Sequence, residues 1–286
     1  MRRINFTPPF AYSSYIFLGS INGLVCLSEF HDTSVCICNP VTKEYVNIPK
    51  FSRESDSDQY KPWARGFGYL PLTNEYKFVE SVRLKTDFSI VEVAVYTVGS
   101  GKGWRNVGRF DLKCGDTLID HGVFVNGALS WVNKCGGMVY VLDLAEEKFR
   151  EHISPPPKPP GWWHGYAIGV LGGVLYYATE HGYHLSESTS DIWLLKGKND
   201  SQGTKEQVEQ ETLGWSYEFS YPEKKPFALV NGGVLYFHLW SLGIYDAVTS
   251  TSKELVRFSS VEQLLPHKNT LISLKELGEE DVKILG

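Results

Sequence analysis

The 286-residue chain has only two methionines and no apolar run long enough to cross a membrane. Its formal charge of −5 comes without any cluster of lysine or arginine, so the electrostatic footprint of a nucleic-acid-binding surface is missing. The apolar stretch Tyr15–Leu18 near the start is too short for the core of a signal peptide. We therefore expect a cytoplasmic or nuclear protein with neither nucleic acid nor membrane among its partners.

The sequence also lacks the common catalytic motifs. Val98–Trp104 resembles a phosphate-binding loop, but it has no glycine at the required spacing before its Gly-Lys pair and no Ser or Thr after the lysine. No Gly-x-Ser-x-Gly nucleophile elbow occurs. His181 and His184 have a spacing that suits zinc on a helix, yet their Gly- and Ser-rich surroundings are typical of a loop. We predict no catalytic residue, no metal site and no cofactor.

The five cysteines are an odd number, and three of them fall inside apolar strand patterns. Without a secretion signal, buried reduced thiols are the expected state. Cys36 and Cys38 point to one face of a predicted strand, but no second pair at metal-ligand spacing accompanies them.

Turns and strand-forming residues are abundant, with 27 glycines, 14 prolines and 14% aromatic residues. Four segments share a tight turn followed by an apolar run, and they recur with a period of about 50 residues once one unmarked repeat is allowed. Strand-built repeats of this period are typical of propeller blades. The four segments are Asn22–Leu27, Asn126–Trp131, Gly172–Tyr177 and Asn231–Tyr236.

Around each segment the sequence predicts a blade of four antiparallel strands. Five whole blades occupy residues 14–48, 65–110, 122–153, 166–219 and 227–258. A sixth blade is expected to be assembled from Ile4–Phe6 and Thr270–Leu274. We thus predict an all-β fold, a β-propeller of about six blades in a single domain, residues 1–286, closed with strands from both termini. Closure would leave no free sheet edge.

This strand order sorts the loops into two sets. The turn end carries the turns between the first and second and between the third and fourth strands of a blade. The linker end carries the remaining turns and the links between blades, including the polyproline stretch before Trp162. That stretch either presents its tryptophans to a partner or lets them fold back onto the ring. The predicted partner contacts are all on the linker end: Trp63, Arg65, Trp162, Trp163, His164, Tyr183 and His184.

A family resemblance follows from several segments in order. Gly19–Leu27 and Cys38–Tyr45 resemble the opening of the plant F-box-associated domain, in which a Gly-Ser-x-Asn-Gly-Leu run precedes an Asn-Pro-x-Thr-x-Glu turn. The resemblance covers roughly residues 16 to 275, and it departs at Leu70 and Ser130, where the family usually has Asp and His. Further matching segments are Gly66–Tyr69, Asn74–Val79, Val95–Thr97, Trp104–Arg105, Val125–Trp131 and Leu271–Leu274.

The resemblance implies a kelch-like propeller that binds protein substrates for a cullin-based ubiquitin ligase and performs no catalysis itself. The helical F-box that docks the ligase adaptor would have to precede Phe17, where only 16 residues stand, so we expect no F-box segment in this chain. Binding of the adaptor and cullin is therefore left open, while substrate binding is retained. Two alternatives remain: an enzyme or sugar-binding propeller with a central-channel site, and a truncated paralogue without ligase activity.

Overall fold

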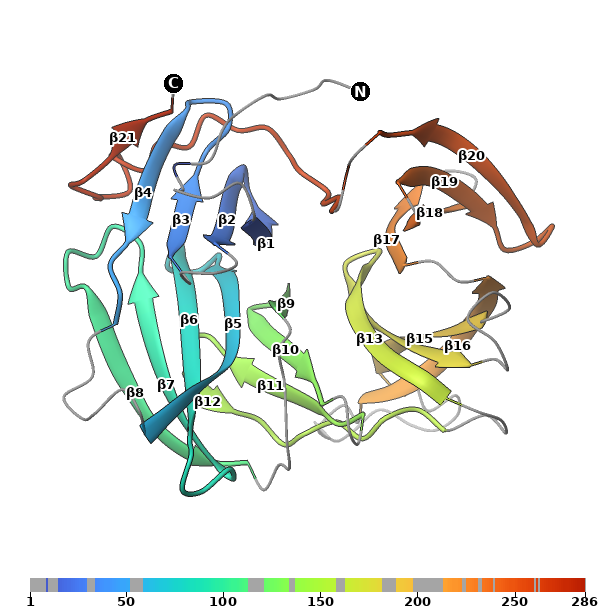
Figure 1. Ribbon diagram of the computed structural model, residues 1–286, viewed down its shortest axis with the longest axis horizontal. Coiled ribbons are helices and arrows are strands. Elements are labelled where there is room, and N and C mark those ends of the chain that lie inside the picture. The colour runs from blue at the N-terminus through green and yellow to red at the C-terminus, as the bar shows by residue number, and fades with distance from the viewer. Residues whose placement is uncertain are drawn as a thin grey trace, which may run out of the picture. The chain divides into compact units, whose positions relative to one another are not determined.

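The computed structural model describes residues 9, 15–29, 34–51, 59–112, 121–133, 137–157, 163–181, 189–197, 213–222, 225–230, 233–238, 240–259, 261 and 263–285. Within these ranges every regular element is a β-strand (Figure 1). The all-β prediction is thus confirmed for the described part of the chain, where no helix is long and apolar enough to span a membrane.

The chain divides into two compact units. Unit 1 contains Met1–Ile153 together with Leu265–Gly286, and unit 2 contains Ser154–Leu264. The chain therefore crosses from unit 1 to unit 2 once and returns to unit 1 near its C-terminus.

Unit 1 begins with a four-stranded antiparallel meander, β1 (Tyr15–Ile21), β2 (Leu24–Glu29), β3 (Val35–Cys38) and β4 (Glu44–Ile48). The β1–β2 hairpin turns at Asn22 and Gly23, whose φ angles of 48° and 86° are the two positive values that a type I′ turn requires. A fifth strand, β21 (Lys283–Ile284), pairs with the outer edge of β4 (Figure 1).

Two further meanders of unit 1 share one eight-stranded sheet. Their strands are β5 (Tyr60–Leu70), β6 (Glu75–Leu84), β7 (Ile90–Thr97) and β8 (Trp104–Asp111), then β9 (His121–Val125), β10 (Ala128–Val132), β11 (Val139–Asp143) and β12 (Lys148–Phe149). The first strands of the two meanders, β5 and β9, pair in parallel at Arg65–His121 and Gly66–Gly122. This side-by-side arrangement of first strands is the one that neighbouring propeller blades have at their inner edges.

Unit 2 contains two four-stranded antiparallel meanders. The first has β13 (Trp163–Leu171), β14 (Val174–His181), β15 (Thr189–Gly197) and β16 (Leu213–Pro222). The second has β17 (Lys225–Val230), β18 (Gly233–His238), β19 (Ser241–Asp246) and β20 (Thr251–Arg257).

The core of each unit lies between neighbouring meanders and is rich in aromatic and β-branched side chains. In unit 1, Trp131 fits against β9 because position 122 is glycine, where a Cβ atom would come 2.8 Å from the indole ring. The Trp131 indole then donates a hydrogen bond to the backbone carbonyl of Arg65, 3.0 Å away. In unit 2, Tyr176, Ile192 and Tyr236 are buried in one cluster shared by both meanders.

The structure confirms five predicted meanders to within a few residues and corrects the predicted sixth. Thr270–Leu274 forms no strand, because its backbone groups are bound by side chains of the first meander instead of by a neighbouring strand. The strand near the C-terminus is β21, at the outer edge of β4. Ile4–Phe6 lies outside the described residues, and the blade number and ring closure stay predictions.

Candidate partner-binding site

Trp63 lies in the core of unit 1, so it has no surface to offer a partner. Its side chain is 2% exposed, and its ring centroid lies 6.2 Å from that of Trp131 and 6.1 Å from that of Tyr140. The guanidinium of Arg83 lies 5.7 Å from the indole centroid. The predicted partner contact at Trp63 does not agree with this burial. β5 starts at Tyr60 and not at Arg65, which places Trp63 inside a strand that is buried against the third meander.

Arg65 connects the first two meanders of unit 1. Its Nη1 donates to Ser28 Oγ of β2 at 2.9 Å, and its Nη2 donates to Glu80 Oε2 of β6 at 3.4 Å. Its side chain is 17% exposed. These contacts give Arg65 a structural role between neighbouring sheets, and its role toward a partner stays a prediction.

The remaining predicted contacts belong to unit 2. Trp163 and His164 start β13, and the pairing of Trp163 with His181 puts the start of β13 beside the end of β14. Both positions are at the linker end of unit 2. Trp162, Tyr183 and His184 lie outside the described residues, as do the side chains of Trp163 and His164.

A polar cluster lies at the same end of unit 2. The buried carboxylate of Asp191 accepts a hydrogen bond from Ser220 Oγ, and its other oxygen lies 3.1 Å from His181 Nε2. The hydroxyls of Tyr217 and Ser220 are 2.9 Å apart. Nucleophilic catalysis requires the imidazole to contact the hydroxyl, whereas here both groups contact the carboxylate separately. The arrangement is suited to holding β14, β15 and β16 together.

Trp240 is a surface aromatic that the sequence interpretation missed. It lies in the β18–β19 turn at the linker end of unit 2 and is 55% exposed. Its φ angle of 64° is in the left-handed region, which costs a non-glycine residue about 1 kcal/mol. The backbone N–H of Phe258 donates to the Trp240 carbonyl at 2.8 Å and fixes the turn. The sequence does contain a signal for this position. Trp240 lies between two short apolar runs, which indicates a turn there.

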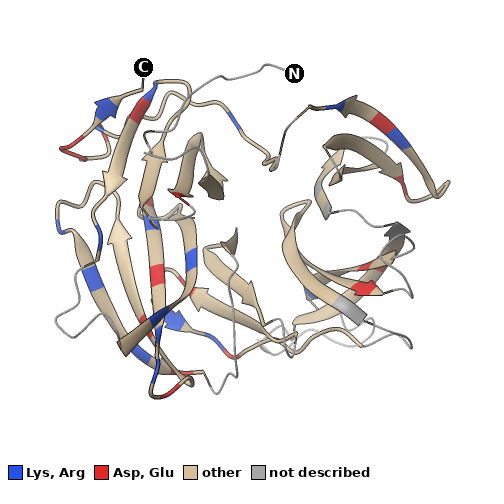
Figure 2. Ribbon diagram, in the orientation of Figure 1, with Lys and Arg blue, Asp and Glu red and all other residues tan. Residues whose placement is uncertain are grey.

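An ion pair lies beside this turn. Arg257 Nη2 donates to Glu254 Oε2 at 2.7 Å, and the Ser241 hydroxyl donates to the same carboxylate oxygen at 2.7 Å. Figure 2 shows acidic and basic residues interspersed along the described strands of each unit. The surface beside Trp240 thus combines an aromatic side chain with polar groups of both signs.

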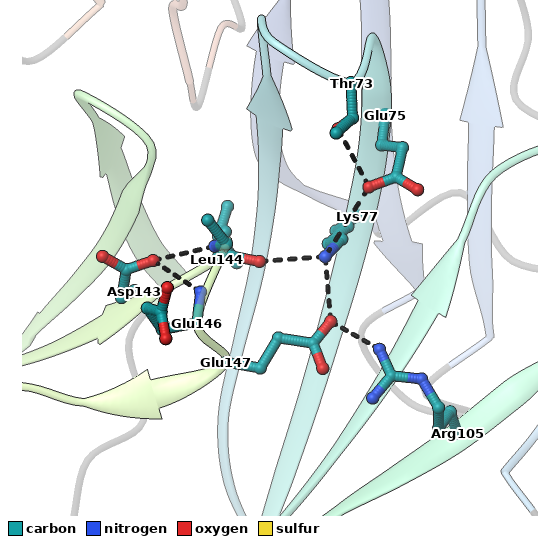
Figure 3. Close-up of polar contacts among 9 residues, drawn as sticks. Thr73, Glu75, Lys77, Arg105, Asp143, Leu144, Glu146 and Glu147 are labelled. Carbon is teal, nitrogen blue, oxygen red and sulfur yellow. Dashed lines mark hydrogen bonds and ion pairs between the residues drawn. The ribbon is translucent and has the colours of Figure 1, made fainter.

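The turn end of unit 1 holds an ion cluster in which the Lys77 and Glu147 side chains are largely buried and the Arg105 side chain is 54% exposed (Figure 3). Lys77 of β6 donates from Nζ to Glu147 Oε1 at 2.8 Å and to the Leu144 carbonyl at 2.9 Å. Arg105 of β8 donates to the same oxygen of Glu147. Burial raises the pKa of the Glu147 carboxyl, but the hydrogen bonds from Arg105 and Lys77 outweigh it, so the pKa is lowered overall. The cluster fastens the β11–β12 turn onto the second meander.

Residues 265–285 cover part of the same turn end. Thr270 Oγ1 donates to the carbonyl of Asn22 at 2.8 Å. The Glu279 carboxylate accepts the backbone N–H of Gly99 at 2.7 Å.

The described cysteines are buried free thiols, as predicted. Cys26, Cys36 and Cys38 are all in the core of the first meander. Burial raises the pKa of the Cys26 thiol, and a hydrogen bond with Cys38 together with burial raises the pKa of Cys36. Such thiols are chemically inert near neutral pH. Among the residues that the structure describes, no group of three or more His, Cys, Asp or Glu side chains is placed to hold a metal ion.

Comparison with protein families decides the identity of this architecture. Residues 3–202 match the model of the F-box associated beta propeller domain. The chain belongs to that family. The resemblance to the F-box-associated family that the Asn-Gly and Asn-Pro-x-Thr-x-Glu turns indicate is confirmed.

Curated relatives of this F-box-associated chain come from Arabidopsis thaliana. The F-box/kelch-repeat protein At3g23880 is 24% identical over 64% of this chain and 49% of its own length. F-box protein At5g49610 is 30% identical over 69% of this chain and 53% of its own length. F-box protein CPR1 is 26% identical over 93% of this chain and 71% of its own length. The chain thus spans about half the length of the first two.

Proposed function

We propose that this chain is a non-catalytic protein-recognition module that selects substrates for a cullin-based ubiquitin ligase. Membership of the F-box-associated propeller family and the F-box names of its relatives support this role. The adaptor and cullin are proposed as partners of a ligase that contains this module, and the cytoplasm or nucleus as its location. The five meanders are proposed to be blades of one closed propeller. A sixth blade of that propeller would not include Thr270–Leu274, because this segment forms no strand.

The proposed contact surface is the linker end of unit 2, and Trp240 is the observation that supports it most directly. Large aromatic side chains are the residues most often responsible for binding energy in protein interfaces. Trp240 is exposed although it is large, and its backbone is held in a conformation that costs free energy. Strained positions of this kind concentrate at functional sites. Trp162, Trp163, His164, Tyr183 and His184 belong to the same proposed surface.

Partner capture by full-length tagged protein in plant cells tests this proposal. The Trp240→Ala variant should lose the proteins that chemical crosslinking attaches to the wild-type chain, and the amounts are measured by quantitative mass spectrometry. Leu72→Ala is the matched control, because Leu72 is fully exposed at the turn end of unit 1 and should leave capture unchanged. Equal capture by Trp240→Ala and wild type would contradict the proposed surface.

The ligase role has its own readout in the same experiment. Recovery of the adaptor and cullin with the chain, together with ubiquitin on the captured partners, is the expected result. Partners recovered without adaptor, cullin or ubiquitin would contradict the ligase role and leave a free-standing recognition module.

A further inference from the structure

The Asn-Pro-x-Thr-x-Glu turn that marks the family binds another part of the same chain. Asn39, the first residue of that turn, is fully buried. Its side-chain Nδ2 donates hydrogen bonds to two backbone carbonyls, those of Thr270 at 3.1 Å and Ile272 at 2.7 Å. Its Oδ1 accepts the backbone N–H of Val41 at 2.9 Å, which holds the amide in this orientation.

Glu44, the last residue of the turn motif, binds the next two residues of that segment. Its Oε2 accepts the backbone N–H of Leu274 at 2.7 Å, and its Oε1 accepts the Ser273 hydroxyl at 2.9 Å. Asn39 thus donates to two backbone carbonyls of the segment, and Glu44 accepts one of its backbone N–H groups. A neighbouring β-strand would bind the same kinds of group. A segment held in this way is recognised mainly through its backbone.

Shape adds selectivity to these backbone contacts. Leu274 is fully buried in the core of the first and second meanders, while Leu271 is 80% exposed. Gly23 leaves room for Thr270, because a Cβ atom at position 23 would lie 1.9 Å from Thr270 Oγ1. The site therefore takes a peptide with a small hydroxyl residue at its first position and apolar residues at its third and fifth.

Downstream contacts hold the rest of the segment. The Glu279 carboxylate accepts hydrogen bonds from the Gly99 N–H at 2.7 Å and from the Tyr96 hydroxyl at 3.2 Å. Leu285 is buried, and its N–H donates to the Lys43 carbonyl at 2.8 Å. All of these contacts are non-covalent and lie in unit 1.

We propose that Asn22, Gly23, Asn39 and Glu44 form a peptide-binding site, here termed the terminal clamp, whose occupant is the chain's own segment Thr270–Leu274. The clamp retains that segment after the chain is cut ahead of it, and it accepts the same peptide supplied in trans. This role is independent of ubiquitin transfer and of the linker end.

Cutting the folded full-length protein tests the clamp. A specific protease site is inserted between Ser259 and Leu265, and the purified protein is cleaved after folding. The C-terminal fragment should then co-elute with the body of the protein in gel filtration. In the Asn39→Ala/Glu44→Gln double variant, the segment loses both hydrogen bonds from Asn39 and one of the two acceptor oxygens of Glu44, so the fragment should dissociate at least about tenfold faster. Leu271→Ala is the control and should retain its fragment like wild type.

A second measurement applies to wild-type protein alone, in case the double variant does not fold. A fluorescent synthetic peptide of residues 265–286 should exchange into the cleaved complex, and a scrambled peptide should not. Three results would overturn the clamp. The wild-type fragment could be lost on cleavage, the double variant could retain its fragment as well as Leu271→Ala does, or the cleaved complex could take up both peptides equally. A dimer before cleavage that separates on cleavage would contradict the occupant, since the segment would then come from a second copy.

Discussion

The ammonium group of Lys77 lies 2.8 Å from the carboxylate of Glu147, although 70 positions separate the two residues in the sequence. Their side chains are only 7% and 11% exposed. Because the desolvation of a buried charge is costly, each group depends on the other and on its hydrogen bonds for compensation. This ion pair makes the contact between the second and third meanders of unit 1 sensitive to loss of either charge.

Glu147→Gln should lower the free energy of unfolding by roughly 2 kcal/mol at neutral pH, because Lys77 and Arg105 lose a charged acceptor. The folded-state pKa of Glu147 is lowered, so its stabilisation is fully present above the ordinary pKa of 4.5. It is lost as the pH falls through the folded-state pKa. The difference between wild type and variant in urea-induced unfolding should therefore shrink at acid pH.

Glu146→Gln is the matched control for this prediction, since the exposed neighbour contributes its backbone N–H to Asp143 and not its carboxylate. It should unfold like wild type at every pH. Equal destabilisation by both variants would show that the ion pair contributes nothing specific.

Gly23→Ala should destabilise the protein more than Gly127→Ala does. Both glycines follow asparagine in hairpin turns with positive φ, 86° and 75°, so both alanines cost about 1 kcal/mol in backbone strain. A Cβ atom at position 23 also collides with Thr270, whereas at position 127 its nearest contact is an ordinary 3.8 Å to Leu70. Thermal unfolding and proteolysis of the C-terminal segment measure the difference. Equal effects of the two alanines would contradict the close approach of Thr270.

Tyr96 should ionise late in an alkaline titration. Burial, and then the negative charge of Glu279, raise its pKa from 10 to about 12. A raised pKa means that the folded state holds its proton after the unfolded state has lost it, so stability falls as the pH rises from 10 to 12. Glu279→Gln removes the charge and should lower this pKa. The measurement is the tyrosinate absorbance as a function of pH for wild type, Glu279→Gln and Tyr96→Phe. A titration curve of Tyr96→Phe identical to that of wild type would refute the assignment of the late-ionising group to Tyr96.

Truncation of Trp63 should destabilise the protein far more than truncation of Trp240. Trp63→Ala should lower the free energy of unfolding by about 3–5 kcal/mol, because it leaves a cavity in a packed aromatic core. Trp240→Gly should stay within about 1 kcal/mol of wild type, since glycine relieves the left-handed strain at an exposed position. Denaturant unfolding of the two variants gives both numbers. A large loss of stability in Trp240→Gly would mean that the residue is needed for folding.

The sequence predicts strands and turns correctly where the local residue pattern and the tertiary packing favour the same structure. The turn at Asn22 and Gly23 and the apolar run of β2 predict the first hairpin, because an Asn-Gly pair suits a type I′ turn. The start of β5 was harder, since its first residues pair with β6 and pack on a meander far along the chain. The sequence therefore predicts Trp63 in the link ahead of the strand and not inside it.

The candidate site was predictable only in part, and the terminal clamp not at all. The mostly apolar run Thr270–Leu274 predicts a strand, yet the partners of its backbone are side chains some 230 positions away. The sequence of a turn motif does not indicate which distant residues its side chains contact. Strand β13 starts with Trp163 and His164 at the linker end of unit 2, and their role toward a partner stays a prediction. The sequence indicates a turn near Trp240, but only the structure gives the exposure of its side chain.

The return of the chain to unit 1 has a mechanical consequence. Unit 2 is inserted within unit 1, so that both of its chain ends are tethered to the same body. With the terminal clamp closed, a single proteolytic cut at either crossing leaves the two units joined through the other. A protein held by unit 2 would therefore remain connected to unit 1 after one such cut, and only a second cut, or release of the clamped segment, would separate them.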